Sequence, residues 1–486
     1  MKKSLLLSAA MLATTPLFAA TVTDGDTYAP VNDIKCVNAW VVDRNHNLDV
    51  FEATKLGSNN QARTCAVRNG VVYIASWAAD DPEVTSTDKD GKVTVQNAGT
   101  LYKFSVETGE YLGAIKLTRD GKRITGTGVA NQVGFDSFGH LWIADMSFNT
   151  NTLYDIYFVN EETGALTLAA SLDKTSQDTA RIDYCDIIGD LTGEKGACTV
   201  LAAASTSTIV YGWCKDQNGT DWYGYFEGVS HKSFTEYYPA QEKASGWSTA
   251  PSVKIVLGEG DEMYYGDLFY VDGASTAPTL YNSTGAIADS FANIENAKDK
   301  GLEQSSLGAN GIVEFRVDGR NFIAYPIEQY TGSYGGCNVN ICEVDADMSF
   351  ASMQKYWKVP ESGFGMTSDG GNRYHGINCE TVTNADGTQY VNLLSFKCNN
   401  GMGLYKIGKN VTGGINDAIA NDAAEITVNG NVITVSAEAS EINVYNVAGQ
   451  VVATANNATE VAAPATGVYV VKAVVAGTPV VKKVVL

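Results

Sequence analysis

Alternating apolar and polar positions run through the middle of the chain and predict β-strands rather than helices. Six hairpins share one layout: an apolar strand, a turn that contains glycine, and a second strand rich in aromatic and β-branched residues. They span Thr64–Ser76, Val133–Asp145, Tyr184–Ala204, Val253–Val271, Ile312–Pro326 and Ile377–Phe396. Their turns recur at intervals of about 60 residues, so the sequence predicts one repeated structural unit.

A second turn lies further along each unit and predicts two more strands. The segments Val106–Tyr111 and Asn160–Ala165 both contain Glu-Thr-Gly. The corresponding turns of the next three units are expected at residues 217–219, 283–285 and 345–348. Each unit therefore holds four strands, as the blade of a β-propeller does.

The sixth unit lacks a fourth strand, because Leu404–Ile407 runs directly into a segment rich in Gly, Asn and Ala. Before the first unit, Val37–Val42 together with Leu48–Phe51 is an unpaired strand-like segment that can fill this place. Such closure removes exposed sheet edges. We therefore expect an all-β protein with a six-bladed β-propeller over residues 31–410, and seven blades as the alternative. One exception is Ile287–Gln304, whose apolar spacing predicts a short helix.

One hairpin carries a family resemblance. Residues Val133–Asp145 read VGFDSFGHLWIAD, an apolar strand, an Asp-x-x-Gly turn, an aromatic-apolar pair and Ala-Asp. This segment resembles the repeat of NHL and gluconolactonase-type propellers, which implies the fold alone. Gluconolactonase-type enzymes hold a divalent cation with Glu, Asn and Asp, and that ligand set has no counterpart at motif-matching positions here. No metal site and no cofactor are therefore expected.

The last sixty residues or so form a separate block of short, Val-rich strands. Ile442–Val451 contains one strand, a turn and the start of a second, while Gly467–Lys472 and Val481–Val484 supply two more. Because each short strand needs a partner to cover its apolar face, we expect a small Ig-like β-sandwich over residues 425–486. Residues 411–424 are expected to be a linker.

Three motifs in this block are VYNVAGQVV, GVYVVK and KKVVL. They resemble the C-terminal sorting domain of the type IX (Por) secretion system. The resemblance implies a partner, the type IX machinery, and export through the outer membrane with removal of this domain and anchoring at the cell surface. The alternative is an ordinary Ig-like accessory module.

The beginning of the chain also predicts export. Lys2 and Lys3 precede the apolar run Leu5–Leu17, and Phe18-Ala19-Ala20 offers a cleavage site in which Phe18 departs from the A-x-A pattern. Residues 1–20 are therefore expected to be a signal peptide. No other apolar run approaches 18 residues, and no transmembrane segment is expected. We therefore expect a secreted protein, at the outer-membrane surface or extracellular.

Charge and cysteine content narrow the class of protein. The formal net charge is −21, which excludes a nucleic-acid partner because phosphate contacts need a basic face. Nine cysteines are an odd number in an oxidising compartment, so at least one should be unpaired within the chain. Bridges between Cys379 and Cys398, Cys185 and Cys198, or Cys337 and Cys342 are possible; the alternative is mostly buried, small apolar side chains.

Polar residues at the start of the innermost strands are the candidate binding residues. In a propeller these positions surround the axial channel, and convergent loops there make a concave pocket. A polar or anionic ligand is the functional reading; the alternative is that these groups bind water and one another. Two long loops add Arg373 and Trp247 to the same set. The candidates are Arg63, Asn131, Arg181, Asp183, Trp247, Arg373, His375 and Asn378.

Two functions remain open at this point. The preferred one is a non-enzymatic, surface-displayed propeller that binds an extracellular glycan or protein. The alternative is a secreted hydrolase or lyase that works in the axial channel, with His375 and either Glu380 or Asp183 as an acid–base pair. The chain has no G-x-S-x-G or H-E-x-x-H motif, so no catalytic residue is assigned.

Overall fold

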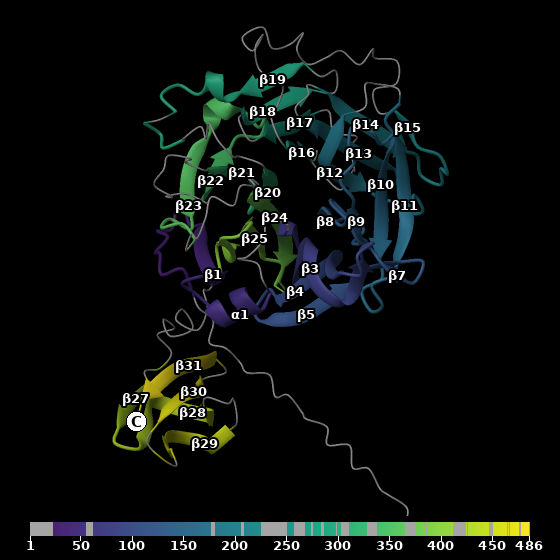
Figure 1. Cartoon of the computed structure of the whole chain (residues 1–486). Coiled ribbons are helices and arrows are strands. Elements are labelled where there is room, and N and C mark those ends of the chain that lie inside the picture. The colour runs from purple at the N-terminus through teal and green to yellow at the C-terminus, as the bar shows by residue number, and fades with distance from the viewer. Residues whose placement is uncertain are drawn as a thin grey trace, which may run out of the picture. The chain divides into compact units, whose positions relative to one another are not determined.

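The computed structural model of the 486-residue chain is almost entirely β-sheet (Figure 1). It describes residues 23–54, 62–175, 180–205, 209–224, 250–256, 268–273, 276–282, 286–297, 299–302, 311–327, 338–364, 375–384, 386–411, 424, 426–446, 451–463, 465, 467–475 and 478–485. The helices in these ranges are α1 (Leu48–Ala53) and the 3-10 turns η3 (Phe291–Asn293) and η4 (Phe350–Ser352). None of them has the length and apolar character of a membrane span.

The strands of residues 21–414 pair into four-stranded antiparallel sheets that follow one another around a centre (Figure 1). Sheet 1 contains β2 (Ala62–Arg68), β3 (Val71–Thr87), β4 (Val93–Ser105) and β5 (Tyr111–Lys116). Sheet 2 contains β8 (Gln132–Phe135), β9 (Leu141–Ala144), β10 (Leu153–Val159) and β11 (Leu166–Asp173). Sheet 3 contains β12 (Arg181–Gly189), β13 (Cys198–Ser205), β14 (Val210–Lys215) and β15 (Tyr223–Gly224). A short β6 (Thr118–Arg119) pairs with β7 (Lys122–Arg123) beside them.

Three further sheets continue the same arrangement. Sheet 4 contains β16 (Ser252–Ile255), β17 (Leu268–Gly273), β18 (Thr276–Asn282) and β19 (Ile287–Ser290). Sheet 5 contains β20 (Val313–Val317), β21 (Arg320–Ile327), β22 (Asn338–Val344) and β23 (Gln354–Val359). Sheet 6 contains β24 (His375–Thr383), β25 (Gln389–Lys397), β26 (Gly401–Gly408) and, from the other end of the sequence, β1 (Lys35–Asp43).

Each of the predicted hairpins forms the first two strands of one sheet, so these predictions are confirmed. The prediction for the N-terminal strand is confirmed for Val37–Val42, because β1 pairs antiparallel with β26 from Lys35↔Gly408 to Asp43↔Gly401. It is wrong for Leu48–Phe51, which lies in the helix α1. Trp40 fixes this strand further, since its buried indole Nε1 donates to the carbonyl oxygen of Val106 at 2.8 Å. A strand from the start of the chain therefore completes the last sheet.

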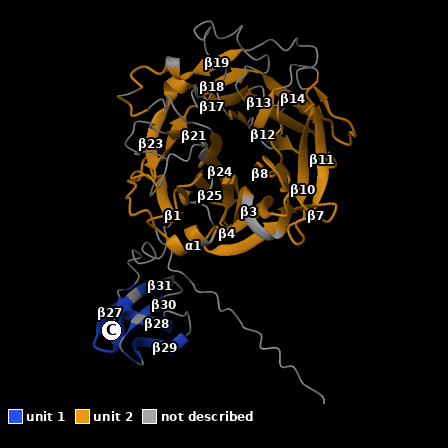
Figure 2. Ribbon diagram, in the orientation of Figure 1, with its two compact units in different colours: residues 1–20, 415–486 blue, residues 21–414 orange. Residues whose placement is uncertain are grey.

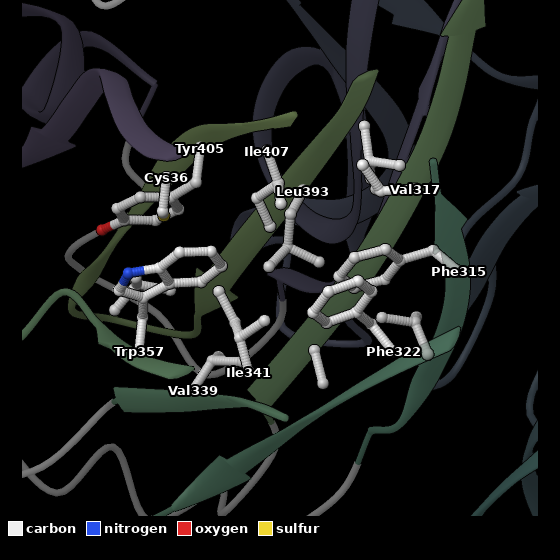
Figure 3. Close-up of a cluster of buried hydrophobic side chains, with 14 of the residues drawn as sticks. Cys36, Phe315, Val317, Phe322, Val339, Ile341, Trp357, Leu393, Tyr405 and Ile407 are labelled. Atoms are coloured by element: carbon white, nitrogen blue, oxygen red, sulfur yellow. The ribbon is translucent and has the colours of Figure 1, made fainter. Parts of the chain in front are cut away.

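Apolar side chains fill the space between successive sheets, including the space between sheet 6 and sheet 1. Figure 3 shows the cluster between sheets 5 and 6. In it, the rings of Phe315 and Phe322 stack with centroids 5.4 Å apart, and the buried Leu393 and Tyr405 approach from sheet 6. Complete burial of each such large side chain contributes about 1.5–3 kcal/mol. The result is a propeller-like all-β fold held by inter-sheet packing.

The predicted helix over Ile287–Gln304 is wrong. Ile287–Ser290 is the outer strand β19, and the 3-10 turn η3 follows it directly. Phe291, Ile294 and Leu302 are buried in the cluster between sheets 4 and 5. Their helical spacing is therefore produced by a 3-10 turn and the loop after it, while Ile287 on β19 packs against the cluster between sheets 3 and 4.

The predicted disulfides are also wrong wherever the structure describes both partners, because no disulfide joins Cys185 to Cys198 or Cys379 to Cys398. Cys185 pairs with Ala202 and Cys198 with Gly189, so the two cysteines are four strand positions apart. At about 3.3 Å a residue this separation is about 13 Å, too far for a bridge. Cys337 lies outside the described residues.

Residues 415–486 form a second compact unit, coloured blue in Figure 2. Its strands make one five-stranded antiparallel sheet in which β28 pairs with β27, β29 and β30, and β30 pairs with β31. Their bounds are β27 (Ile426–Asn429), β28 (Val432–Asn446), β29 (Val451–Ala462), β30 (Val468–Val475) and β31 (Thr478–Val485). The inward residues form a separate apolar core that includes Ile433, Ile442 and Val471. An Ig-like sandwich stays a prediction.

Candidate ligand-binding site

The innermost strands of the six sheets surround a cavity of about 470 Å3. These strands are β2, β8, β12, β16, β20 and β24. A cavity of this size can hold a small ligand or the end of a larger one. The polar and charged residues of its lining are Thr64, Arg68, Asn69, Gln132, Asp186, Ser252, Lys254, Asn378, Glu380 and Thr381.

Several of these polar side chains bind the backbone of the next innermost strand. Gln132 Nε2 donates to the carbonyl oxygen of Cys185 at 2.7 Å, and Gln132 Oε1 accepts from the amide of Cys185 at 2.8 Å. Asp186 Oδ2 accepts from the amide of Ile255 at 2.7 Å. These bonds join sheet 2 to sheet 3 and sheet 3 to sheet 4, so they orient the sheets as well as line the cavity.

The same kind of bond joins sheet 6 to sheet 1. Asn378 Oδ1 accepts from the amide of Val67 at 3.0 Å, and Glu380 Oε1 accepts from the amide of Asn69 at 2.7 Å. Asn378, which the sequence predicts as a binding residue, lines the cavity but uses its amide oxygen for this contact. Asn378 therefore fits the alternative prediction, in which the polar groups of the channel bind other groups of the protein.

A second polar group lies just outside the cavity lining, at the start of the innermost strands. Arg181 Nε is 3.2 Å from Asp183 Oδ1, and its Nη2 makes a closer contact with the same oxygen. Arg63 Nη1 lies 3.9 Å from that oxygen, while Asn131 Nδ2 donates to the carbonyl oxygen of Asp183 at 2.7 Å. We call Arg63, Asn131, Arg181 and Asp183 the arginine cluster. The cluster joins residues of sheets 1, 2 and 3. No local sequence pattern relates these residues to one another.

The arginine cluster retains unused hydrogen-bonding capacity. Its two guanidinium groups and one carboxylate leave a formal charge of +1. Asp183 is fully buried, whereas the side chains of Arg63 and Arg181 are 13% and 30% exposed. Arg63 Nε, Asp183 Oδ2 and Asn131 Oδ1 are buried without a hydrogen-bond partner within the part of the chain that the structure describes. Because buried polar atoms are normally paired, these positions favour a polar ligand or ordered water.

Tyr184 connects the arginine cluster to the cavity. It follows Asp183 in β12, is almost fully buried and lines the cavity. Burial raises the pKa of Tyr184, and the positive charge of Arg63 opposes that rise. The guanidinium of Arg63 therefore acts electrostatically on a side chain of the cavity wall.

A charged pair that the sequence patterns do not reveal lines the cavity itself. Lys254 Nζ is 3.1 Å from Asp186 Oδ1. Burial lowers the pKa of Lys254, but Asp186, Cys379 and Glu314 together outweigh this effect and hold that pKa above its ordinary value. Burial also raises the pKa of the Cys379 thiol to about 12, so this cavity residue offers no thiolate at neutral pH. Asp186 and Lys254 are mid-strand residues 68 positions apart, so only the packing of two sheets reveals the pair.

The structure says less about the remaining residues that the sequence predicts for the site. Trp247 and Arg373 lie outside the described residues. His375 begins β24, where its backbone pairs with Lys397. The predicted acid–base pair of His375 with Glu380 is wrong, because five residues along one strand separate their Cα atoms by about 16 Å.

Asp136, His140 and Asp190 form a further acidic group, at the turns that end β8 and β12. His140 Nδ1 lies 2.8 Å from Asp136 Oδ2, which also accepts from the amide of Leu191 at 3.1 Å. Asp190 Oδ2 accepts from the amide of Lys195 at 2.7 Å. The carboxylates thus already bind turn amides, which accounts for the cluster without a cation.

Comparisons with known proteins identify no family. No family model and no curated protein sequence matches the chain. Among solved structures, a DUF4623 family protein from Bacteroides eggerthii is 10% identical with a TM-score of 0.49, covering 79% of this chain and 76% of that chain. An α-L-arabinofuranosidase from Fusarium graminearum is 9% identical with a TM-score of 0.37, covering 71% and 92%. An endo-arabinase from Bacteroides thetaiotaomicron is 9% identical with a TM-score of 0.31, covering 74% and 97%.

Proposed function

We propose that the protein is an exported, surface-displayed binding protein whose arginine cluster takes an acidic group of an extracellular glycan. The observation that carries this proposal is the meeting of Arg63 and Arg181 on one buried carboxylate, with the Nε donor of Arg63 left unsatisfied beside the central cavity. A guanidinium presents paired N–H donors that match a carboxylate, and such charge-assisted bonds are stronger than neutral ones. A local charge of +1 on a chain of net charge −21 favours a carboxylate at this position over other parts of the molecule.

The scaffold in this proposal is a closed six-bladed β-propeller over residues 31–410. Support comes from β1, which pairs in sheet 6, and from the apolar cluster between sheets 6 and 1. The bond from the Val67 amide to Asn378 supports it on the side of the cavity. A closed ring keeps the innermost strands at fixed separations, so the arginine cluster is positioned before a ligand arrives.

Calorimetry with acidic oligosaccharides tests the binding role. The purified chain is titrated with hexagalacturonate and a hyaluronan hexasaccharide. We expect at least one to bind, and we expect Arg63→Gln and Arg181→Gln each to weaken binding about tenfold or more, the loss of one charge-assisted bond. The matched control is Arg320→Gln, which breaks an Arg–carboxylate pair with Glu343 outside the cavity lining. Failure of both sugars to bind, or equal binding by all variants, would overturn the proposal.

A hydrolase or lyase acting in the cavity is the second candidate. The observation that favours it is the Lys254–Asp186 pair, two titratable groups in contact in a concave space. The same titration samples are assayed for new reducing ends and for unsaturated products. Product formation that Lys254→Met abolishes would support the enzyme; intact oligosaccharides after prolonged incubation support binding alone.

Export by the type IX machinery is part of the proposal, with residues 425–486 as the sorting signal. Their strand pattern, their three motifs and their separate apolar core support this assignment. Fusing residues 415–486 behind a signal peptide and a reporter tests it in strains with and without the machinery. Surface display in both strains, or in neither, contradicts it.

A further inference from the structure

The tryptophans that the structure shows to be buried form two sets, which differ in the hydrogen bonding of the indole N–H. Trp40, Trp213 and Trp357 are at most 5% exposed, and each Nε1 donates to a backbone carbonyl oxygen at 2.8 Å. Trp77 and Trp142 are 7% and 3% exposed, and neither Nε1 has a hydrogen-bond partner among the described residues. Since an indole nitrogen can only donate, these two groups each lack an acceptor.

Both tryptophans without an acceptor lie at the candidate site. Trp77 lies beside the arginine cluster, because Arg63 Cζ is 5.4 Å from the centroid of its ring. Trp142 lies on β9 and lines the central cavity. The three tryptophans that have an acceptor do not line this cavity. The unpaired indole donors therefore occur where a ligand is expected, and the paired donors occur elsewhere.

Gly134 allows Trp142 to reach the cavity from the second strand of sheet 2. The two residues are paired across β8 and β9, and both line the cavity. A Cβ on Gly134 would lie 2.4 Å from Cζ2 and 2.8 Å from Cε2 of Trp142. The indole edge that carries Nε1 therefore occupies the place of a side chain on the innermost strand. For this reason an N–H donor from β9 lies in the wall of the cavity.

The two unpaired donors lie at different depths along the innermost strands. Trp77 is at the level of the arginine cluster, through its contact with Arg63. Asn131 of that cluster directly precedes β8, and Gly134 lies three positions further along the chain. At about 3.3 Å a residue, Gly134 and the indole above it are about 10 Å from the cluster. A ligand that contacts both donors must therefore be longer than one sugar ring.

We propose that the indole N–H groups of Trp77 and Trp142 donate hydrogen bonds to the acidic oligosaccharide. Trp77 donates beside its carboxylate, and Trp142 donates to a hydroxyl or ring oxygen further along the sugar chain. The inference rests on the proposed function and identifies further residues that contact that ligand. Together with Arg63 Nε, the two groups favour a ligand rich in acceptor oxygens. An unpaired buried donor destabilises the free protein, and an acceptor on the ligand removes that penalty.

Ligand length separates the two donors in the test. Hexagalacturonate is titrated by calorimetry into the full chain and into Trp77→Phe and Trp142→Phe, and galacturonate is measured by displacement of the hexamer. Phenylalanine keeps an aromatic ring but has no N–H. We expect Trp77→Phe to weaken both ligands about fivefold or more. Trp142→Phe should weaken the hexamer by a similar factor and leave the monomer within about twofold of the wild type. If only the hyaluronan hexasaccharide binds, it and glucuronate replace this pair of ligands.

Trp213→Phe is the matched control for a purely structural effect. Trp213 belongs to the same buried cluster between sheets 2 and 3 as Trp142, but its Nε1 donates to the carbonyl oxygen of Asp173 and it does not line the cavity. This variant should be less stable and should bind both ligands like the wild type. Equal losses of hexamer affinity in Trp213→Phe and Trp142→Phe would overturn the assignment of Trp142 to ligand contact.

Gly134→Ala gives a second test, which also serves if Trp142→Phe does not fold. The added methyl group must displace the indole of Trp142 while the tryptophan itself is retained. We expect the hexamer to bind less tightly and the monomer to bind as before. Unchanged affinity for the hexamer would show that the position of this indole does not matter, and would overturn the role of Trp142.

The outcomes for this inference differ from those for the proposed function. The inference is overturned if the two arginine variants weaken binding while Trp77→Phe and Trp142→Phe bind both ligands like the wild type. The proposed function would survive that result. If no acidic oligosaccharide binds to the wild type, the proposed function is itself contradicted and the inference is overturned with it.

Discussion

Asp183 and Asp272 are both fully buried carboxylates, but they have different roles because their neighbours differ. Asp183 contacts two arginines and anchors the arginine cluster. Asp272, on β17, is held by neutral donors: the hydroxyl of Ser252 and, at 3.0 Å, the amide of Gly311. Burial raises the pKa of Asp272 to about 7. The first residue serves a charged site, and the second fastens sheet 4 to the chain that enters sheet 5.

Asp272 makes the stability of the protein depend on pH. Its pKa is about 3.9 when unfolded and about 7 when folded, so the folded state binds the extra proton between these values. The free energy of unfolding contributed by this group is therefore full below about pH 4 and falls as the pH rises towards 7, by roughly 2–4 kcal/mol. Urea unfolding from pH 4 to 8 should show this slope in the wild type. Asp272→Asn should remove that component and Asp347→Asn should keep it; equal slopes in all three chains would contradict the assignment.

At the scale of secondary-structure elements, the turns between strands differ in how closely they pack against neighbouring strands. Gly109 lies in the turn between β4 and β5 with φ of +70°, and a Cβ there would come within 2.7 Å of the Trp40 ring. The contact places the outer turn of sheet 1 against the strand that completes sheet 6. Gly70, in the turn between β2 and β3, has a similar φ of +81° but no neighbour within 4 Å of such an atom.

Gly109→Ala and Gly70→Ala should therefore differ in stability. Both substitutions add the strain of a left-handed conformation, about 1–2 kcal/mol. Gly109→Ala also forces a methyl group against the buried indole of Trp40, which adds roughly 1–3 kcal/mol. Chemical denaturation of the two variants measures the difference. Equal losses would show that the turn yields without disturbing Trp40.

The elements were predictable where local chemistry specifies them. Glycine turns between alternating strands predicted the hairpins, and the missing fourth strand of the sixth unit predicted the place of β1. Strand register was not predictable, and the supposed bridge between Cys185 and Cys198 fails on register alone. The arginine cluster followed from the general position of its residues at strand starts. The Lys254–Asp186 pair depends on a contact between sheets, which sequence patterns do not record.

At the scale of the whole molecule, sheet 6 is where the two ends of the propeller-like unit meet. β1 supplies its outer edge, while Asn378 and Glu380 on β24 bind backbone amides of sheet 1. These contacts lie on the outer and the inner side of the same sheet. We therefore expect the width of the cavity to depend on the attachment of sheet 6 to sheet 1.

Asn378→Ala tests this view against a ligand-binding role. The substitution leaves the partly buried amide of Val67 without its acceptor and should lower the free energy of unfolding by about 1–3 kcal/mol. The affinity for acidic oligosaccharide should stay within about twofold of the wild type, a change of about 0.4 kcal/mol. Asn384→Ala, in the exposed turn after β24, is the control and should change neither quantity. Lost affinity with unchanged stability would return Asn378 to the binding site.

The most direct test of the account compares hexagalacturonate with its methyl ester by calorimetry on the wild type and on Arg181→Gln. Esterification removes the ligand's negative charge and keeps its size. We predict that the wild type binds the acid at least about tenfold more tightly than the ester, and that Arg181→Gln loses most of this preference. Equal affinity of the wild type for acid and ester would contradict recognition of a carboxylate by the arginine cluster.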